Sequence, residues 1–321
     1  MGVLIAAINL SKSFGGLSAV RDVSFEVHSG EIYGLVGPDG AGKTTTIRLL
    51  CGAYLPDYTV EGGESRIMLG GFDMIHDPEK ARSQVGYLPQ RFSMYEELTV
   101  LENIRFFAEV RGQAASDWLE SCMEILEFVG LADFINRKAG QLSGGMKQKL
   151  GLAAALVHHP RVLLLDEPTT GVDPVTRQDF WQLIIRLVSS SGNNANGTAV
   201  FISTPYMDEA ARCTRIGFML EGRLVEQGSP SELQKPLIGR ILELSGTPLP
   251  LLRQIAKKCK FVEDVQMFGD RLHLRVGAGK AGEALSLLKG QIEKQGGQTR
   301  SLRVISPILE DVFMEFSQDL G

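Results

Sequence analysis

The 321-residue sequence predicts an α/β fold, in which helices cover a mostly parallel sheet, followed by a small α+β domain. Strand-like and helix-like segments alternate along the first part of the chain, as in parallel sheets with helices on their faces. The run VLLLD at 162–166 is continuously apolar, which is typical of a strand buried on both sides. Three prolines then occur within 236–250. We therefore predict two domains, 1–235 and 236–321.

Each element is predicted from its local pattern. Strand-like runs occupy 3–8, 23–27, 31–36, 66–69, 85–88, 162–165, 199–203, 215–220 and 223–227. Helix-like patterns occupy 43–51, 99–111, 116–129, 144–158, 174–190 and 206–212. After residue 236, helix-like and strand-like segments alternate again, and we predict a ferredoxin-like plait for this small unit.

Composition argues against several classes of protein. The net charge is −5 and the pI is near 5.7, whereas nucleic-acid-binding proteins usually carry a basic excess, so we expect no nucleic-acid partner. The four cysteines lie far apart and form no C-x-x-C pair, which argues against a zinc site or a disulfide framework. No stretch approaches the roughly 18 consecutive apolar residues of a membrane span. We expect any role at a membrane to depend on a partner.

A glycine-rich loop, GPDGAGKTT at 37–45, follows a predicted strand and opens a predicted helix. The pattern G-x-x-x-x-G-K-[ST] in this context indicates a P-loop, whose backbone N–H groups and helix N-terminus bind phosphate. We expect Lys43 to reach the β- and γ-phosphates of ATP and the Thr44 hydroxyl to ligate Mg²⁺. The predicted nucleotide-binding residues of the loop are Gly37, Pro38, Asp39, Gly40, Ala41, Gly42, Lys43, Thr44 and Thr45.

Two carboxylates, Asp166 and Glu167, stand at the end of the buried strand in VLLLDEP, 162–168. A buried acid without a cation is costly, so Mg²⁺ is the natural partner of Asp166. Glu167 follows directly, where it can polarise an attacking water as a general base. The alternative is that the two acids merely cap the helix that begins near residue 174.

Three more motifs occur in order along the chain: YLPQ at 87–90, LSGGMKQKLGLA at 142–153 and GVD at 171–173. Together with the P-loop and LLLDEP, they resemble the ATP-binding subunits of ABC transporters over residues 3 to about 235. This resemblance implies a P-loop ATPase domain, with a mixed sheet and a helical subdomain, that binds ATP and Mg²⁺.

The details resemble one branch of that family. GPDGAGKTT, YEELTVLENI and LLLDEPTTGVDP are similar to the subunits of ABC-2-type exporters, in particular to the first nucleotide-binding domain of YbhF-type multidrug efflux ATPases. SPILEDVFMEF at 306–316 is similar to the end of the small accessory domain on many ABC-2 ATPases. The resemblance implies an ATPase that energises multidrug or ion efflux.

The resemblance also implies roles for single residues. Phe14 would stack on adenine, although a plain core or loop phenylalanine fits the sequence too. Gln90 would contact Mg²⁺ and relay to the membrane subunit. The implied catalytic residues are then Glu167, Gln90 and Lys43, and the implied metal ligands are Thr44, Gln90 and Asp166.

The implied partners are membrane-spanning permease subunits and a second ABC ATPase domain. Two such domains pair head to tail in the family, so Ser143, Gly144 and Gly145 would contact ATP held by the partner's P-loop. The chain would then be cytoplasmic and peripheral on the inner face of the cell membrane. A soluble ABC protein acting outside transport is the alternative.

One position departs from the family pattern. Where the family has a histidine that hydrogen-bonds the γ-phosphate, this chain has Pro205, which offers no donor. We therefore predict an impaired site in an asymmetric pair, with a heteromeric partner that carries the histidine, rather than a homodimer. A nucleotide-sensing subunit with little turnover is a second interpretation. A third is that Ser203, Thr204 or a water replaces the missing donor.

Overall fold

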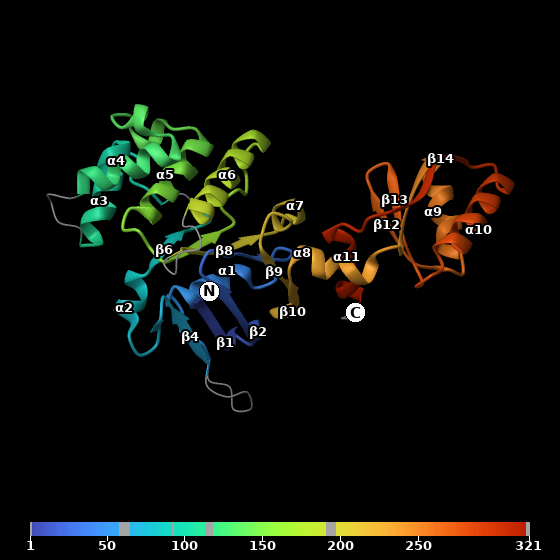
Figure 1. Cartoon of the computed structure of the whole chain (residues 1–321), viewed down its shortest axis with the longest axis horizontal. Coiled ribbons are helices and arrows are strands. Elements are labelled where there is room, and N and C mark those ends of the chain that lie inside the picture. Colours follow the sequence, from blue (N-terminus) through green and yellow to red (C-terminus); the bar gives the residue numbers. More distant parts are fainter. Residues whose placement is uncertain (1, 58–64, 92, 113–117, 191–196, 319–321) are drawn as a thin grey trace. The chain divides into compact units, whose positions relative to one another are not determined.

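The computed structural model describes residues 2–57, 65–91, 93–112, 118–190 and 197–318. The chain divides into two compact units, Met1–Gly228 and Ser229–Gly321 (Figure 1). This boundary lies seven residues before the one predicted at 235/236. The reason is packing, because helix α8 (Pro230–Gln234) contacts helix α11 (Leu309–Gln318) and so belongs to the second unit.

A six-stranded sheet organises the first unit, with the order β10-β9-β3-β8-β7-β6. Its strands are β3 (Ile32–Val36), β6 (Val85–Leu88), β7 (Val162–Asp166), β8 (Ala199–Thr204), β9 (Arg215–Leu220) and β10 (Arg223–Gly228). All neighbours pair in parallel except β9 and β10. Every residue of β3, β7 and β8 is buried, which explains their continuous apolar sequences. Parallel strands end at one edge of the sheet, so the segments that follow β3, β7 and β8 meet there.

A second, antiparallel sheet has the order β2-β1-β4-β5. It comprises β1 (Val3–Phe14), β2 (Leu17–His28), β4 (Arg66–Leu69) and β5 (Phe72–Asp73). The prediction of one mostly parallel sheet missed this layer, because strand-like patterns do not show which strands pair. The tight β1–β2 connection is made by Gly15 and Gly16, both with positive φ. Helix α1 (Lys43–Leu50) packs into the core that the two sheets share.

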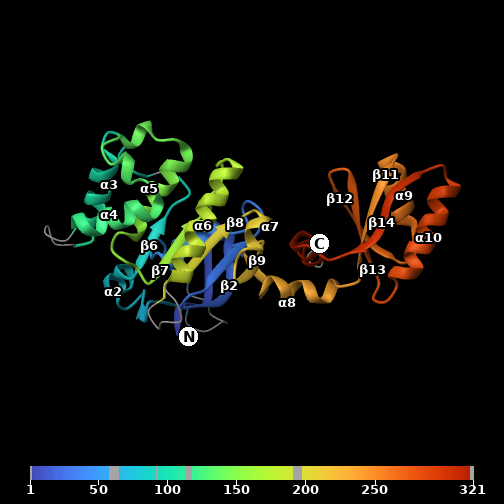
Figure 2. The same cartoon turned by 45° about the horizontal axis from the view of Figure 1, so that its top comes forward.

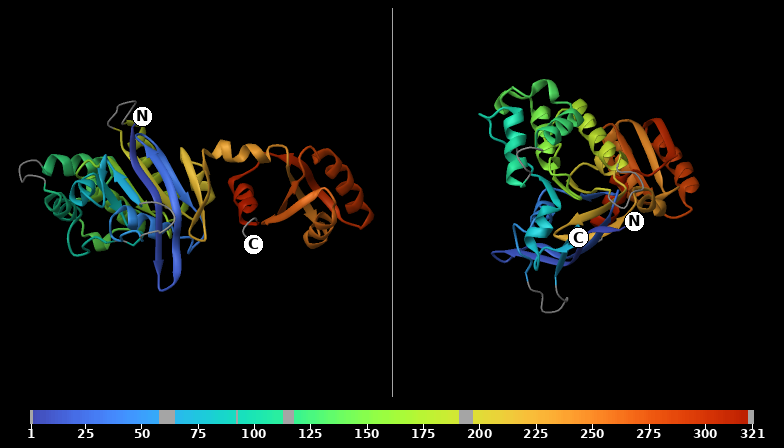
Figure 3. Two further views of the ribbon diagram at one scale, coloured as in Figure 1. Left: turned by 90° about the horizontal axis from the view of Figure 1, so that it is seen from below. Right: turned by 60° about the vertical axis from the view of Figure 1, so that its left-hand side comes forward.

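The remaining helices of the first unit are α2 (Pro78–Ser83), α3 (Val100–Val110), α4 (Trp118–Val129), α5 (Gly144–Leu156), α6 (Pro174–Ser190) and α7 (Met207–Ala210), with short 3-10 helices at Ala132–Phe134 and Ala139–Gln141. Helices α3, α4 and α5 pack on one another, away from the antiparallel sheet, and form a helical subdomain (Figure 3). The side chain of Thr99 accepts a hydrogen bond from Glu102 in a capping box that starts α3. No described helix is long and apolar enough to cross a membrane.

The second unit adds four antiparallel strands in the order β12-β13-β11-β14. Along the chain its elements are α8, the 3-10 helix Lys235–Leu237, β11 (Ile241–Thr247), α9 (Leu249–Lys258), β12 (Val262–Phe268), β13 (Arg271–Val276), α10 (Ala281–Lys294), β14 (Gln298–Ile305) and α11. From β11 to β14 this is the β-α-β-β-α-β connectivity of a ferredoxin-like plait. Helices α9 and α10 contact each other and the same sheet, and they lie together in Figure 2.

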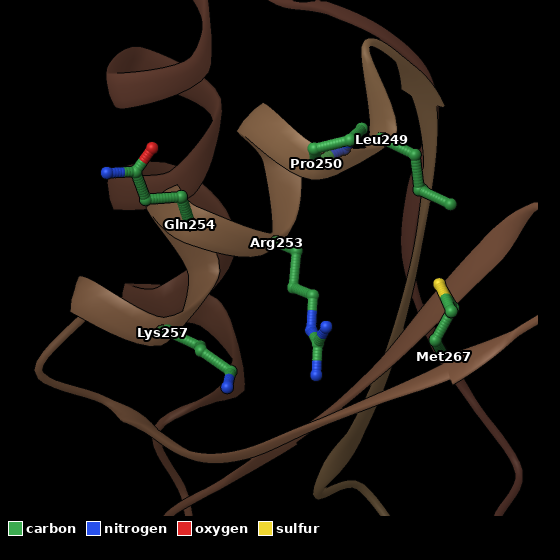
Figure 4. A pocket seen from close by; sticks show the side chains of 6 residues that line it. All are labelled: Leu249, Pro250, Arg253, Gln254, Lys257 and Met267. Atoms are coloured by element: carbon green, nitrogen blue, oxygen red, sulfur yellow. The ribbon is translucent and has the colours of Figure 1, made fainter.

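A cavity of about 480 Å³ lies within the second unit, beside α9 and the edge strand β12. Leu249, Pro250 and Met267 line its apolar part, and the side chains of Arg253 and Lys257 extend from α9 next to it (Figure 4). All of the residues that line it come from α9 and β12, so the cavity belongs to this unit alone.

Candidate active site

The P-loop joins β3 to α1 and depends on glycine at three positions. Gly40 and Gly42 have φ values of 79° and 109°, in the left-handed region that glycine tolerates. A Cβ atom at Gly37 would collide with the carbonyl oxygen of Met219, and one at Gly42 with that of Ala19. The loop therefore packs too closely on neighbouring backbone for any side chain at Gly37 or Gly42.

Lys43 begins α1 and only 3% of its side chain is exposed. Its Nζ donates hydrogen bonds to the carbonyl oxygens of Gly37, at 2.9 Å, and Pro38, at 3.0 Å. Nζ also lies 3.1 Å from Oε1 of Glu167. The buried ammonium group is thus surrounded by oxygen acceptors, which satisfies a charge that would be costly to bury alone.

Asp166 ends β7 and connects three elements. Its Oδ1 accepts hydrogen bonds from Thr44 of α1, at 3.0 Å, and from Ser203 of β8, at 2.9 Å. Burial raises the pKa of the Asp166 carboxyl, and the hydrogen bonds from Ser203 and Thr44 oppose this rise. A carboxylate beside a hydroxyl is an oxygen donor set that fits Mg²⁺, which proteins usually hold by one or two carboxylates together with phosphate oxygens and water. The described residues contain no cluster of three acidic, His or Cys side chains that could hold a metal by themselves.

Glu167 adopts a φ of 46°, which is uncommon outside glycine and occurs at functional sites. Its backbone N–H donates to Oγ of Ser203 at 3.0 Å, which fixes this strained residue. Its Oε2 accepts hydrogen bonds from Nε2 of Gln90, at 2.9 Å, and from the Thr170 hydroxyl, at 3.3 Å. Gln90 therefore contacts the predicted general base in this structure, not the predicted metal ligand Asp166.

The alternative role of the two acids, as caps for the helix after residue 174, is wrong. Asp173 serves that function, because its Oδ1 accepts hydrogen bonds from the backbone N–H groups of Val175 and Thr176 at the start of α6. The carboxylates of Asp166 and Glu167 instead bond to P-loop and β8 side chains and to Gln90. The pair is therefore free for chemistry at the end of β7.

These side chains meet around one cavity of about 530 Å³. It is lined by Ala19, Asp39, Gly40, Gly42, Lys43, Thr44, Thr45, Gln90, Glu167, Thr170, Pro205 and Tyr206. The structure thus brings together the P-loop, Gln90 and Glu167, as the sequence motifs predict. Ala19, Thr170 and Tyr206 were not predicted, since none of them stands in a position whose residue type alone indicates chemistry.

Comparisons with known proteins agree with this geometry. The family model described as ABC transporter matches residues 20–170. The Nod factor export ATP-binding protein I of Burkholderia lata is 38% identical over 266 residues, which cover 82% of this chain and 83% of that protein. The linearmycin resistance ATP-binding protein LnrL of Bacillus subtilis is 30% identical over 98% of both chains. The chain belongs to the ABC transporter ATP-binding proteins. These proteins are P-loop ATPases, as the sequence predicts.

Two further comparisons refine this assignment. The probable multidrug ABC transporter ATP-binding protein YbhF of Escherichia coli is 42% identical over 74% of this chain, but the match covers only 39% of YbhF. The chain therefore spans about two fifths of that relative's length. Among solved structures, the ADP form of the MJ1267 cassette has a TM-score of 0.63 at 25% identity, covering 74% of this chain and 96% of its own. The ABC cassette fold predicted for the first domain is confirmed.

Phe14, the predicted adenine-stacking residue of this ABC domain, lies at the end of β1 and does not line the cavity. Its ring is 43% exposed, which excludes a core position. Tyr54 packs edge-on against it at 5.2 Å between ring centroids, and Nζ of Lys12 lies 5.8 Å from the ring centroid. An exposed ring held in this way retains a free surface for stacking, and the adenine role stays a prediction.

The signature segment Ser143-Gly144-Gly145 lies at the start of α5. The Ser143 side chain accepts a hydrogen bond from the Met146 backbone N–H at 3.3 Å and caps the helix. Ser143 and Gly144 are exposed, whereas Gly145 packs so closely on Thr176 that a Cβ there would collide with it. None of the three residues lines the cavity, so any contact that they make with nucleotide would involve a second domain.

Pro205 lines the cavity at the position where the family resemblance implies a histidine, and the hydroxyls of its two preceding neighbours are bonded elsewhere. The Ser203 hydroxyl donates to Asp166 and accepts from the Glu167 N–H. The Thr204 hydroxyl donates to Glu209 at 2.6 Å and accepts from the Tyr206 N–H at 3.1 Å. Both hydroxyl protons are donated to carboxylates in this structure, and neither residue lines the cavity, so the alternative in which Ser203, Thr204 or a water serves the γ-phosphate stays a prediction.

Proposed function

We propose that this chain binds ATP with Mg²⁺ and hydrolyses it to drive export through a separate membrane permease. The observation that carries this proposal is the convergence of Lys43, Thr44, Gln90 and Glu167 on one cavity, with Asp166 bonded directly behind Thr44.

Each of these residues has a definite role in the proposal. The P-loop backbone and Lys43 bind the phosphates, so Lys43 exchanges its ion pair with Glu167 for phosphate oxygens. Thr44 and Asp166 would hold Mg²⁺, which neutralises phosphate charge when bound. Glu167, released from Lys43 and oriented by Gln90, accepts a proton from the attacking water.

Export is proposed from the relatives. YbhF is named for multidrug transport, LnrL for linearmycin resistance and the Burkholderia protein for Nod factor export. All three names describe removal of a compound or resistance to it. We therefore place this chain on the inner face of the cell membrane, with the compound selected by the permease.

A second ABC ATPase domain is the other proposed partner. The solved MJ0796 cassette, 25% identical to this chain with a TM-score of 0.61 over 70% of this chain and 98% of its own, is described as dimeric. Exposed Ser143 and Gly144 are available for such pairing. Because Pro205 supplies no donor, we favour a heteromeric partner that carries the histidine. Pro205 also favours a second candidate function, a nucleotide-sensing subunit with little turnover.

The test is Mg²⁺-dependent ATP hydrolysis by the full chain, in wild type and Glu167→Gln. The proposal predicts measurable turnover in wild type and loss of most of it in the variant. Glu31→Gln serves as the control, because Glu31 is also buried but binds Arg215 and the His28 N–H outside this cavity. Equal rates in wild type and Glu167→Gln would refute the assignment. ATP binding without any turnover, even with the permease, would favour the sensor.

A further inference from the structure

Glu209 is a buried carboxylate next to the active site, with a role that the sequence motifs do not indicate. It lies in α7, and only 1% of its side chain is exposed. Its Oε1 accepts a hydrogen bond from the Thr169 hydroxyl and its Oε2 accepts one from the Thr204 hydroxyl, both at 2.6 Å. Nε of Arg177 lies 3.8 Å from Oε1. Both hydrogen bonds are at the short end of the range for O–H···O contacts.

The two threonines belong to two walls of the cavity, the segments that follow the paired strands β7 and β8. Thr169 stands between Glu167 and Thr170, which both line the cavity after β7. Thr204 ends β8 and directly precedes Pro205 and Tyr206, which also line it. Each oxygen of the Glu209 carboxylate therefore holds one wall, and Glu209 adds a buried link between them beyond the β7–β8 pairing and the Ser203 bonds.

The wall after β8 depends on this link for its conformation. The Thr204 hydroxyl, while it donates to Glu209, accepts a hydrogen bond from the backbone N–H of Tyr206. This pair of bonds folds the chain around Pro205. The Tyr206 ring lies 5.1 Å from the Arg177 guanidinium, which also pairs with Asp208 at 3.4 Å. Release of Thr204 from Glu209 would remove the buried side-chain bond that orients this turn.

We propose that Glu209 is a positioning residue for hydrolysis, which clamps the Glu167–Thr170 wall to the Thr204–Tyr206 wall. This inference rests on the proposed ATPase function. Glu209 touches no part of the cavity itself, so it acts through the two threonines. Pro205 offers no side-chain donor, so we expect the wall that it shares with Tyr206 to act through its placement, which Glu209 supports.

Substitutions at Glu209 separate this role from a general loss of stability. Glu209→Ala removes both links, and we expect kcat to fall by about tenfold to a hundredfold, since a misplacement near 1 Å has effects of that order. The KM for ATP should change little, because Lys43 and the P-loop do not contact Glu209. Glu209→Gln keeps an acceptor for one threonine and offers its amide N–H to the other hydroxyl, so it should restore most of kcat. Thr204→Val removes one link, so its kcat should lie between those of Glu209→Ala and Glu209→Gln.

The experiment measures kcat, KM for ATP and amide hydrogen exchange on the full chain for these variants. Exchange at 204–210 should rise in Glu209→Ala and Thr204→Val and stay near wild type in Glu209→Gln. Glu31→Gln, a buried carboxylate elsewhere, is the control and should change neither kcat nor this exchange. A folded Glu209→Ala with wild-type kcat and exchange would overturn the inference. So would a Thr204→Val variant with wild-type kcat and exchange, should Glu209→Ala fail to fold.

The hydrogen-exchange measurement tests the clamp separately from the proposed function. Absence of hydrolysis in the wild type would contradict the proposed function, while increased exchange at both 167–171 and 204–210 in Glu209→Ala would still show the clamp. Active wild type with an unaffected Glu209→Ala would contradict the clamp alone.

Discussion

Nζ of Lys43 lies 3.1 Å from Oε1 of Glu167, and both side chains are nearly buried. The cation that the P-loop offers to phosphate is therefore neutralised by the proposed general base, which Gln90 also contacts. Glu167 and a phosphate group would compete for the same ammonium. The ion pair thus neutralises both buried charges while no nucleotide is bound. When phosphate oxygens replace Glu167 as the partner of Lys43, Glu167 becomes free to accept a proton from the attacking water.

This competition predicts that Glu167→Gln binds Mg·ATP more tightly than wild type while losing turnover. Removal of the carboxylate charge leaves Lys43 with only neutral acceptors. Breaking these contacts when Lys43 binds phosphate then costs less free energy. We expect a gain of up to about tenfold in affinity, equivalent to about 1.4 kcal/mol. Fluorescence titration with a labelled ATP analogue measures it. Weaker binding in the variant would show that Glu167 supports nucleotide binding instead of competing with it.

Pro205→His should restore the donor found in other ABC domains. A hydrogen bond to a charged group contributes about 1.5–3 kcal/mol, so one made in the transition state would raise turnover by roughly 10- to 100-fold at this site. Pro205→Ala is the matched control, because it frees the backbone without adding a donor. Steady-state ATPase rates of the two variants are compared with wild type, and only Pro205→His should be faster. An equal rise in both variants would mean that the proline ring, not the missing imidazole, limits the rate.

In the assembled pair, the two sites should respond differently to mutation. Ser143→Arg would obstruct ATP held by the partner and abolish most turnover, whereas Glu167→Gln should remove only the slower component. The two ATPase rates are compared in the purified complex. If Glu167→Gln is as damaging as Ser143→Arg, both sites hydrolyse together and the asymmetric pair is excluded.

Stability should fall in acid because of His158, at the end of α5. Burial, with Arg111 nearby, lowers its pKa from 6.5 to about 4, while a hydrogen bond to the Val85 carbonyl opposes this shift. Between these two pH values the unfolded state binds the proton more readily, so this contribution to stability is lost as the pH falls. His158→Gln retains an N–H donor for Val85 and should flatten the loss of Tm from pH 6.5 to 4. An unchanged pH profile would contradict this explanation.

The sequence predicts the centre of the site well for a physical reason. The P-loop and Pro205 each follow a buried strand and Asp166 ends one, and parallel strands end at one edge, so the sequence alone predicts that they meet. The hydroxyl links of Ser203, Thr204 and Thr169 were missed, because these residues form their bonds only after β7 and β8 pair. The domain boundary shows the same limit, since the unit against which α8 packs depends on its contact with α11, far along the chain.

The central claim is that this cavity binds Mg·ATP, and calorimetry on wild type and Lys43→Ala tests it most directly. Lys80→Ala is the control, because Lys80 is an exposed lysine that pairs only with Asp77 among the described residues. The account predicts saturable Mg·ATP binding by wild type and Lys80→Ala and at least about tenfold weaker binding by Lys43→Ala, from loss of a charged hydrogen bond. Equal ATP affinity in all three proteins would contradict it.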